Sequence, residues 1–124
     1  MRWFRKAGLG AFACSILIHA SDNVPSKTVT GWVLDSACAF TKGLSKPVSR
    51  DCALACARKG SPLVILQDDG TVYWPISDSV PALGQNARLL PFAGKRVTAA
   101  GKVYSRNGSN ALVITKIDEA ATRH

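Results

Sequence analysis

The segment LVILQDDGTVYWPI, residues 63–76, decides the fold. Its two outer parts, residues 63–67 and 71–76, are rich in apolar, β-branched and aromatic side chains, and they flank Asp68-Asp69-Gly70. Glycine adopts a positive φ at little cost, so an Asp-Gly turn between two such runs is typical of a β-hairpin. The segment therefore predicts two antiparallel strands.

Three further strands are expected around this hairpin. Residues 28–35 (TVTGWVLD) are rich in β-branched and aromatic residues and predict the first strand, with Gly31 as a bulge or a point of close backbone approach. Residues 96–104 and 111–117 alternate in polarity and predict two strands that turn at Asn107-Gly108. The sequence therefore predicts five strands.

One short helix is expected between the first two strands. Residues 36–48 are polar and predict a loop. Ser49 or Asp51 can then cap a helix through residues 52–59, which ends at Gly60. This helix has two to three turns and is the only one expected of that length.

Five strands, one short helix and tight turns favour a small OB-like β-barrel, because closure removes exposed strand edges. The alternative is an open antiparallel sheet with the helix packed on one face. Residues 77–94 contain two prolines and two glycines and predict a wrapping connection. We place the barrel at residues 28–118, with a flexible lead-in at residues 21–27 and a flexible tail at residues 119–124.

Residues 1–20 (MRWFRKAGLGAFACSILIHA) have the pattern of a secretory signal peptide, with basic residues first, an apolar stretch next and the small residue Ala20 last. The apolar stretch is shorter than the ~20 residues that span a bilayer, so cleavage after Ala20 outweighs a retained anchor. A lipid anchor at Cys14 is the weaker alternative, because residues 11–13 fit a lipobox poorly. The sequence therefore predicts a periplasmic or extracellular protein whose mature chain has no transmembrane span.

The chain is basic, with a formal net charge of +8. Three of its 16 lysines and arginines, and none of its 8 acidic residues, lie in residues 1–20, so the mature domain carries about +5. Such a surplus favours anionic partners. An exported protein meets the cell envelope rather than nucleic acid, so we expect an anionic envelope component, a glycan or a protein as the partner.

Four stretches resemble an uncharacterised family of small exported bacterial proteins with a GxxxDxxC…CxxxC pattern: residues 31–38 (GWVLDSAC), 52–56 (CALAC), 60–66 (GSPLVIL) and 92–103 (FAGKRVTAAGKV). Together they span most of the mature chain. The resemblance implies an OB-like barrel and brings no established activity. Members often carry a histidine between the first cysteine and the CxxxC pair, and this chain has none there.

The cysteines Cys38, Cys52 and Cys56 are the most distinctive side chains of the expected mature domain. Export favours oxidation, so a disulfide from Cys38 to Cys52 or to Cys56 is the first expectation. It would close a short loop and stabilise the fold by about 3 kcal/mol in the chain-entropy model. The third cysteine would then remain a thiol.

Two other roles remain open for the same three cysteines. Cys52 and Cys56 share one helical face, and Cys38 could add a third thiolate for Cu(I) or Zn(II), although no fourth protein ligand for zinc is indicated. Thiol redox chemistry is the other role, because Cys52 stands near a helix N-terminus, where the thiolate is favoured. The CxxxC spacing differs from the CxxC of thioredoxin-like enzymes.

A ligand surface is expected on the outside of the barrel, where strand aromatics can stack beside basic side chains. The candidate residues are Trp32, Tyr73, Trp74, Lys95, Arg96, Lys102, Tyr104 and Arg106. Burial of Trp32 and Trp74 in the core is the competing interpretation, because aromatic side chains contribute much to the core of a small domain.

Catalysis is not expected, because no histidine lies between residues 20 and 123 to form a Ser-His-Asp or Cys-His pair. The sequence therefore predicts an exported binding or envelope-associated module that uses no cofactor and has a disulfide-stabilised loop and helix. The alternative is a metal-binding or thiol-redox protein that uses Cys38, Cys52 and Cys56.

Overall fold

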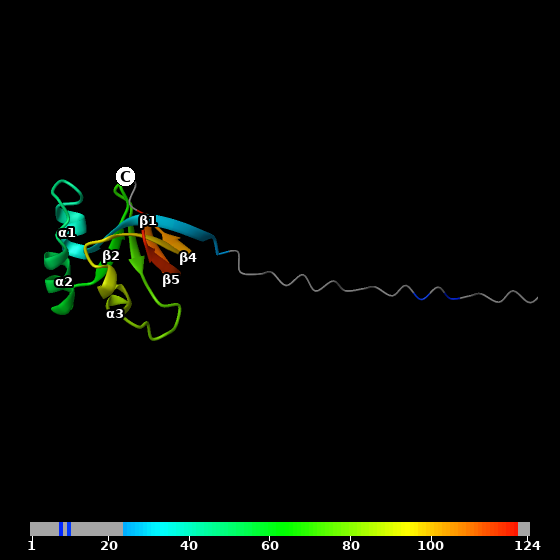
Figure 1. Cartoon of the computed structure of the whole chain (residues 1–124). Coiled ribbons are helices and arrows are strands. Elements are labelled where there is room, and N and C mark those ends of the chain that lie inside the picture. The colour runs from blue at the N-terminus through cyan, green and yellow to red at the C-terminus, as the bar shows by residue number, and fades with distance from the viewer. Residues whose placement is uncertain (1–7, 9, 11–23, 122–124) are drawn as a thin grey trace, which may run out of the picture.

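The structure is a computed structural model that describes Gly8, Gly10 and residues 24–121 (Figure 1). The predicted signal peptide, its cleavage point and Cys14 lie outside the described residues, apart from the two glycines. Within the described part, no helix is long and apolar enough to cross a bilayer.

Five strands form a closed barrel in the order β1-β2-β3-β5-β4, with β4 paired back onto β1. The strands are β1 (Ser26–Asp35), β2 (Leu63–Leu66), β3 (Val72–Pro75), β4 (Arg96–Arg106) and β5 (Ser109–Glu119). The β3–β5 pair is parallel and the other four pairs are antiparallel. The predicted OB-like barrel is therefore confirmed, and the open-sheet alternative is wrong.

The two predicted hairpins are present. Strands β2 and β3 pair antiparallel around Gly70, which has a φ of 89°. Strands β4 and β5 turn at Asn107 and Gly108, both with positive φ, and they are longer than expected. Strand β1 also begins at Ser26 rather than at residue 28, because its first residues pair with β4.

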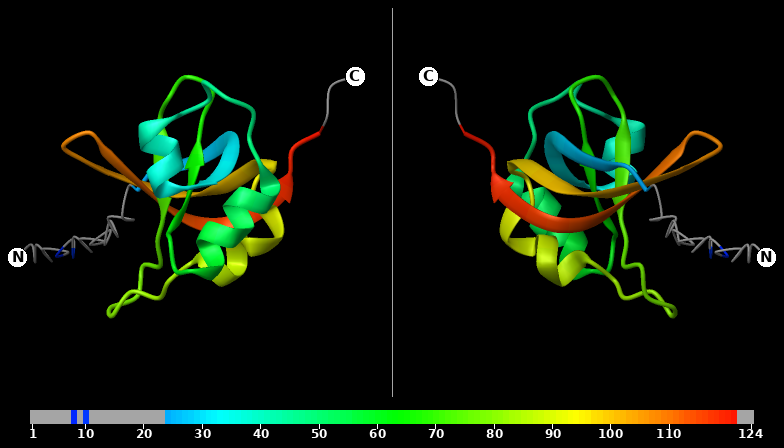
Figure 2. Two further views of the ribbon diagram at one scale, coloured as in Figure 1. Left: turned by 90° about the vertical axis from the view of Figure 1, so that its left-hand side faces the viewer. Right: turned by 90° about the vertical axis from the view of Figure 1, so that its right-hand side faces the viewer.

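The connection between β1 and β2 holds two helices, so the prediction of a single one was wrong. Helix α1 (Ser36–Thr41) occupies the segment that was expected to be a loop, and Asp35 caps it by accepting a hydrogen bond from the Cys38 N–H. Helix α2 (Arg50–Arg58) is capped by Ser49, one of the two predicted caps. Figure 2 shows both helices on the outside of the barrel.

The connection between β3 and β4 carries α3 (Asn86–Leu89) and the short 3₁₀ helix η1 (Leu90–Phe92). Side chains of this segment and of α2 join the residues inside the barrel, so the two segments close one of its ends (Figure 2). The shared core includes Ala53, Ala57, Leu89 and Ala93.

The apolar core has two layers, because the middle strands are buried on both faces. Val33 and Ile65 point into the barrel, whereas their neighbours Leu34, Val64 and Leu66 form an outer cluster with Ala39 of α1. Helix α1 thus covers the outer face of β1 and β2. This cover explains why β2 reads as an unbroken apolar run, with all four of its residues buried.

Gly31 is a point of close approach, as predicted. A Cβ atom at this position would lie 2.8 Å from the carbonyl carbon of Leu66 on the paired strand β2. A side chain there would separate β1 from β2 just before the segment that carries Asp35 and α1. The absence of a side chain at residue 31 therefore helps to place the helices that build the candidate site.

Candidate functional site

Asp35 links the barrel to the cysteine-bearing helices. It is the last residue of β1, and only 5% of its surface is exposed. Its carboxylate accepts hydrogen bonds from the Cys38 N–H at 2.8 Å and from the Ser61 hydroxyl at 2.6 Å. Burial raises the pKa of Asp35, but the hydrogen bonds from Ser61 and Cys38 outweigh it and hold the pKa below its usual value.

The same carboxylate raises the pKa of the Cys38 thiol. Its hydrogen bond to Asp35 is the largest cause that raises its pKa, and burial and the charge of Asp35 act in the same direction. The positive charge of Lys42 lowers the pKa of Cys38 and opposes these effects only in part. A raised pKa lowers the nucleophilicity of Cys38 at neutral pH, since the thiolate is the reactive form.

Replacing Asp35 with asparagine is expected to make Cys38 react several-fold faster with iodoacetamide at about pH 8, because the thiol loses the group that raises its pKa. Asparagine can still cap α1, so the fold should be kept. Mass spectrometry of the labelled protein would follow the rate at each cysteine, with Cys52 as the internal control. An unchanged or slower rate at Cys38 would contradict this role of Asp35.

All three described cysteines are free thiols, so the predicted disulfide is absent. Cys38 lies on α1, whereas Cys52 and Cys56 lie on successive turns of α2. Each helix has its own cap, at Asp35 and at Ser49, and these caps fix the two helices independently. A disulfide requires close and correctly directed Cβ atoms, and cysteine spacing along the chain did not contain that information.

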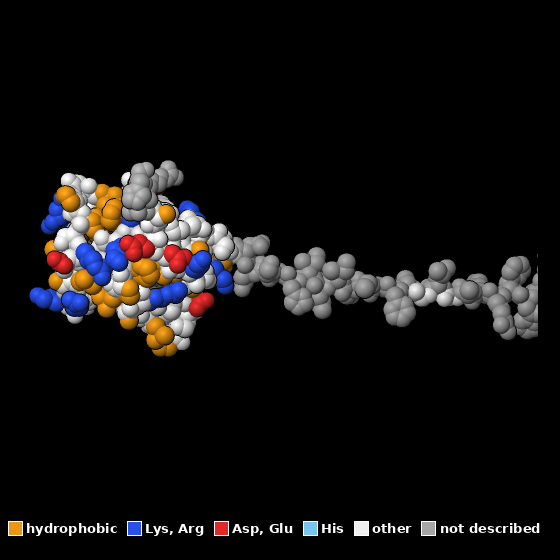
Figure 3. Space-filling view, in the orientation of Figure 1, with side chains coloured by type: hydrophobic (Ala, Val, Ile, Leu, Met, Phe, Trp, Pro, Cys, Tyr) orange, Lys and Arg blue, Asp and Glu red, His pale blue; other side chains and the backbone are white. Residues whose placement is uncertain are grey.

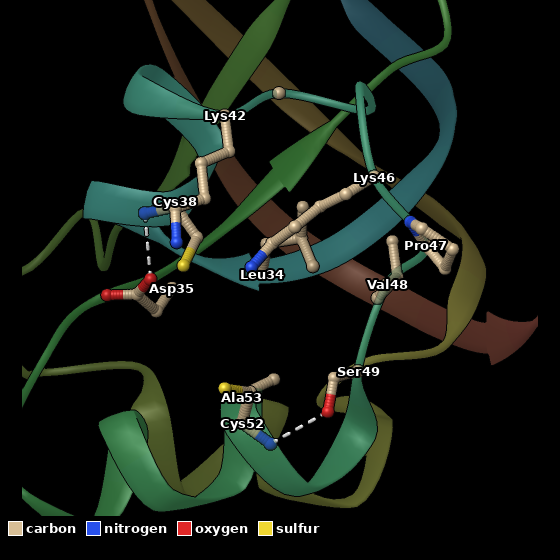
Figure 4. Close-up of a pocket in the computed structure, with 11 residues that line it drawn as sticks. Leu34, Asp35, Cys38, Lys42, Lys46, Pro47, Val48, Ser49, Cys52 and Ala53 are labelled. Carbon is tan, nitrogen blue, oxygen red and sulfur yellow. Dashed lines mark hydrogen bonds between the residues drawn. The ribbon is translucent and has the colours of Figure 1, made fainter.

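The three cysteines do not form the predicted three-thiolate site either. Among residues 24–121, no group of three or more His, Cys, Asp or Glu side chains is arranged to hold a metal ion. Cys38 and Cys52, however, line one small cavity of about 40 Å³ between α1 and the start of α2. Lys42 and Lys46 also line it, whereas Cys56 does not. Figure 4 shows the sulfur atoms of Cys38 and Cys52 directed toward the space between the two helices.

The predicted ligand surface is only partly assembled. Tyr73 is buried inside the barrel, where its hydroxyl accepts a hydrogen bond from Lys27 at 2.9 Å. It cannot share a face with Trp74, because successive strand residues point to opposite sides. Trp32 and Trp74 are both half-buried and pack against the outer cluster, so each contributes in part to the core, as the competing interpretation expected.

The predicted basic residues on β4 and just before it do not gather into one patch. Arg96 pairs with Asp68 at 3.0 Å, and Lys95 pairs with Glu119 at 3.4 Å. Lys102 is exposed and does not line the grooves around Trp74. Acidic and basic side chains are interspersed on the face shown in Figure 3. This pattern differs from the continuous positive surface that a polyanion would favour.

Trp74 is the residue around which the remaining candidates gather. It lines three grooves, with volumes of about 530, 440 and 430 Å³. Tyr104 and Arg106 line the first of them, together with Asn110 from β5. Phe40 of α1 lines the second, and its ring centre is 5.9 Å from that of Trp74. We call Phe40, Trp74, Tyr104 and Arg106 the Trp74 face. Asn110 borders the first groove, but it pairs with Tyr73 and Ser105, so its side chain points to the opposite side of the sheet from Trp74.

Phe40 of the Trp74 face and the nearby Asn110 were missed from the sequence. Phe40 is 63% exposed, and a large aromatic side chain in an otherwise polar segment was the available signal. Asn110 follows the β4–β5 turn, and its amide oxygen accepts a hydrogen bond from Ser105 at 2.7 Å, which orients the amide. Nothing in the local sequence indicated that this turn would lie beside Trp74, because the parallel β3–β5 pair brings them together.

No family model, no curated protein and no solved structure matches the chain. Its function is therefore inferred from the geometry of the candidate sites.

Proposed function

We propose that this chain is an exported, non-catalytic binding module that holds an oligosaccharide on the Trp74 face. The observation that carries the proposal is the convergence of three grooves on one half-buried tryptophan. Grooves of several hundred Å³ fit small ligands of a few rings. A chain of sugar rings can place successive units in adjoining grooves.

The side chains of the Trp74 face suit sugars. Aromatic rings offer a flat apolar surface to the C–H groups of a pyranose, and Phe40, Trp74 and Tyr104 are partly or largely exposed. Hydroxyl and guanidinium groups can bond the sugar hydroxyls, and Ser109 and Arg106, which pair with each other across β4 and β5, supply them in the same groove. The face therefore combines a stacking platform with hydrogen-bonding groups at its edge.

Charge favours a sugar over nucleic acid. The three grooves are lined by one basic residue, Arg106, and one acidic residue, Asp69. Binding to a phosphate backbone depends on several cations, each of which neutralises one phosphate. A single guanidinium can hold one carboxylate of an acidic sugar, so an uncharged or weakly acidic glycan fits better than a polyphosphate.

Fold-level analogy points the same way. OB-fold barrels bind oligosaccharides and oligonucleotides with their middle strands and with the loops after the first and fourth strands. Here Trp74 lies on β3, Phe40 lies in the connection after β1, and Ser109 and Asn110 begin β5 just after the β4–β5 turn. The analogy supports the location of the site, and the lining residues support the ligand class.

Replacing Trp74 with alanine is expected to weaken binding to bacterial cell-wall polysaccharide at least about tenfold, which corresponds to 1.4 kcal/mol of lost stacking. Co-sedimentation of the purified protein with insoluble wall polysaccharide would measure the change. Trp32→Ala is the matched control, because Trp32 packs on the same outer cluster but does not line the three grooves. Phe40→Ala and Tyr104→Ala, at exposed positions, should weaken binding without unfolding the chain.

Equal binding by the parent and the Trp74→Ala protein would contradict the proposal, as would equal losses in the Trp74 and Trp32 variants. Thermal unfolding of every variant would show whether a loss of binding reflects a loss of fold.

A further inference from the structure

A second site, separate from the Trp74 face, lies in the small cavity between α1 and α2. Two thiols line it from two different helices: Cys38 is half-buried on α1, and Cys52 is exposed in the first turn of α2. The cavity, at about 40 Å³, is large enough for one or two water-sized groups and too small for an organic ligand. Figure 4 shows both sulfur atoms bordering the same space.

A pair of thiolates suits one soft monovalent cation. Cu(I) prefers thiolate ligands and is satisfied by two of them, whereas structural zinc sites take four ligands. Within residues 24–121, no third His, Cys, Asp or Glu side chain completes a group around these thiols. The donor set therefore selects Cu(I) over Zn(II).

The charged side chains around the cavity suit the complex that Cu(I) would form with two thiolates. Binding releases one proton from each thiol, so that Cu⁺ and two thiols give a bis-thiolate complex of charge −1 and two protons, with no change of oxidation state. Lys42 and Lys46 line the same cavity and can offset this negative charge. Asp35 also lines the cavity and its negative charge opposes the complex, so the two lysines must offset both charges; the Ser61 hydroxyl and the Cys38 N–H stabilise the Asp35 carboxylate.

We propose that Cys38 and Cys52 together bind one Cu(I) ion in the cavity between α1 and α2. Cys56, one turn further along α2, acts electrostatically on Cys38 but does not line the cavity, so the proposal leaves it out of the ligand set. The site depends on the reduced thiols that the structure contains, and it is independent of saccharide binding on the Trp74 face.

The test is anaerobic competition between the reduced protein and the chromogenic chelator bathocuproine disulfonate, with Cu(I) itself as the probe. The parent protein should withdraw one Cu(I) per chain. Cys38→Ser and Cys52→Ser should each lower the Cu(I) affinity by at least about a hundredfold, because loss of a ligand should cost at least as much as loss of a supporting contact around it. Cys56→Ser is the matched control and should keep the parent affinity. Any contribution from Cys14, if it is retained, is the same in all four proteins.

X-ray absorption of the copper-loaded protein should give two sulfur neighbours in the parent and in Cys56→Ser. Cys52 is exposed, so Cys52→Ser should keep the parent melting temperature and isolates the loss of a ligand from a loss of fold. The proposal is overturned if the parent leaves all Cu(I) with the chelator, if Cys56→Ser loses as much affinity as Cys52→Ser, or if Cys52→Ser binds like the parent.

Discussion

Replacing Gly101 with alanine is expected to destabilise the barrel by about 3 kcal/mol or more, which would lower the melting temperature of a domain of this size by roughly 12 °C or more. A Cβ atom at this position would overlap the carbonyl oxygen of Val113 and lie 2.8 Å from the carbonyl carbon of the same residue. Both atoms belong to the backbone of the paired strand β5, so no side-chain rotation can relieve the contact.

The close approach at Gly101 comes from a bulge in the longest strand pair. Ala100 faces Lys116 while Gly101 faces Ile114, so the pairing skips Thr115. The Thr115 hydroxyl donates to the Ala100 carbonyl at 3.0 Å, which pins the bulge. A bulge bends its strand and increases the local twist, and a small barrel needs such a bend to close.

Gly84→Ala is the control for this prediction, because nothing lies within 4 Å of a Cβ atom at Gly84 and its φ needs no glycine. That variant should keep or slightly raise the melting temperature, since alanine restricts the unfolded chain. Thermal unfolding followed by circular dichroism would compare the two proteins. Similar melting temperatures for Gly101→Ala and the parent would mean that β4 and β5 are not this close.

The second large effect is expected at Leu112, whose replacement by alanine should cost about 2–5 kcal/mol. Leu112 is completely buried, and it faces Pro75 of β3 on one side and Val103 of β4 on the other. Its backbone carbonyl also accepts a hydrogen bond from the Ile76 N–H at 3.0 Å. The substitution would leave a cavity beside the parallel β3–β5 pair, which is one of the five strand pairs of the closed barrel.

Leu83→Ala makes the same chemical change at a side chain that is 68% exposed and should cost less than about 0.5 kcal/mol. Denaturant unfolding of both variants would give the difference in unfolding free energy. If Leu112→Ala cost no more than Leu83→Ala, β5 would not lie between β3 and β4 as the barrel requires.

The fold was predictable because its strands are bounded by strong local signals. The Asp69-Gly70 and Asn107-Gly108 turns each require positive φ at glycine, and the structure has it at both. Tyr73 could also have been placed correctly, because it alternates with Trp74 along β3 and only one of the two can face outward. A correct prediction of the ligand surface therefore depends on the alternation of side chains along each strand as well as on the types of residue.

Helix α1 and the cysteine geometry could not be read in the same way. Six residues give little helical periodicity, and α1 exists because Asp35 caps it and because Ala39 packs on the outer face of the barrel. The distance between Cys38 and Cys52 depends on how two separately capped helices pack against the barrel. The spacing of the cysteines along the chain therefore predicted a disulfide that the structure lacks.

The most direct measurement of saccharide binding on the Trp74 face is a nuclear magnetic resonance titration of the ¹⁵N-labelled protein. The probes would be soluble tetrasaccharides of β-linked glucose, mannose and N-acetylglucosamine, together with one uronic acid oligomer. The account predicts that at least one of them shifts the indole N–H signal of Trp74 and the amide signals of Tyr104, Arg106 and Asn110, while the Trp32 indole signal stays in place. Unchanged spectra with all four sugars, or shifts centred on Trp32 instead, would contradict it.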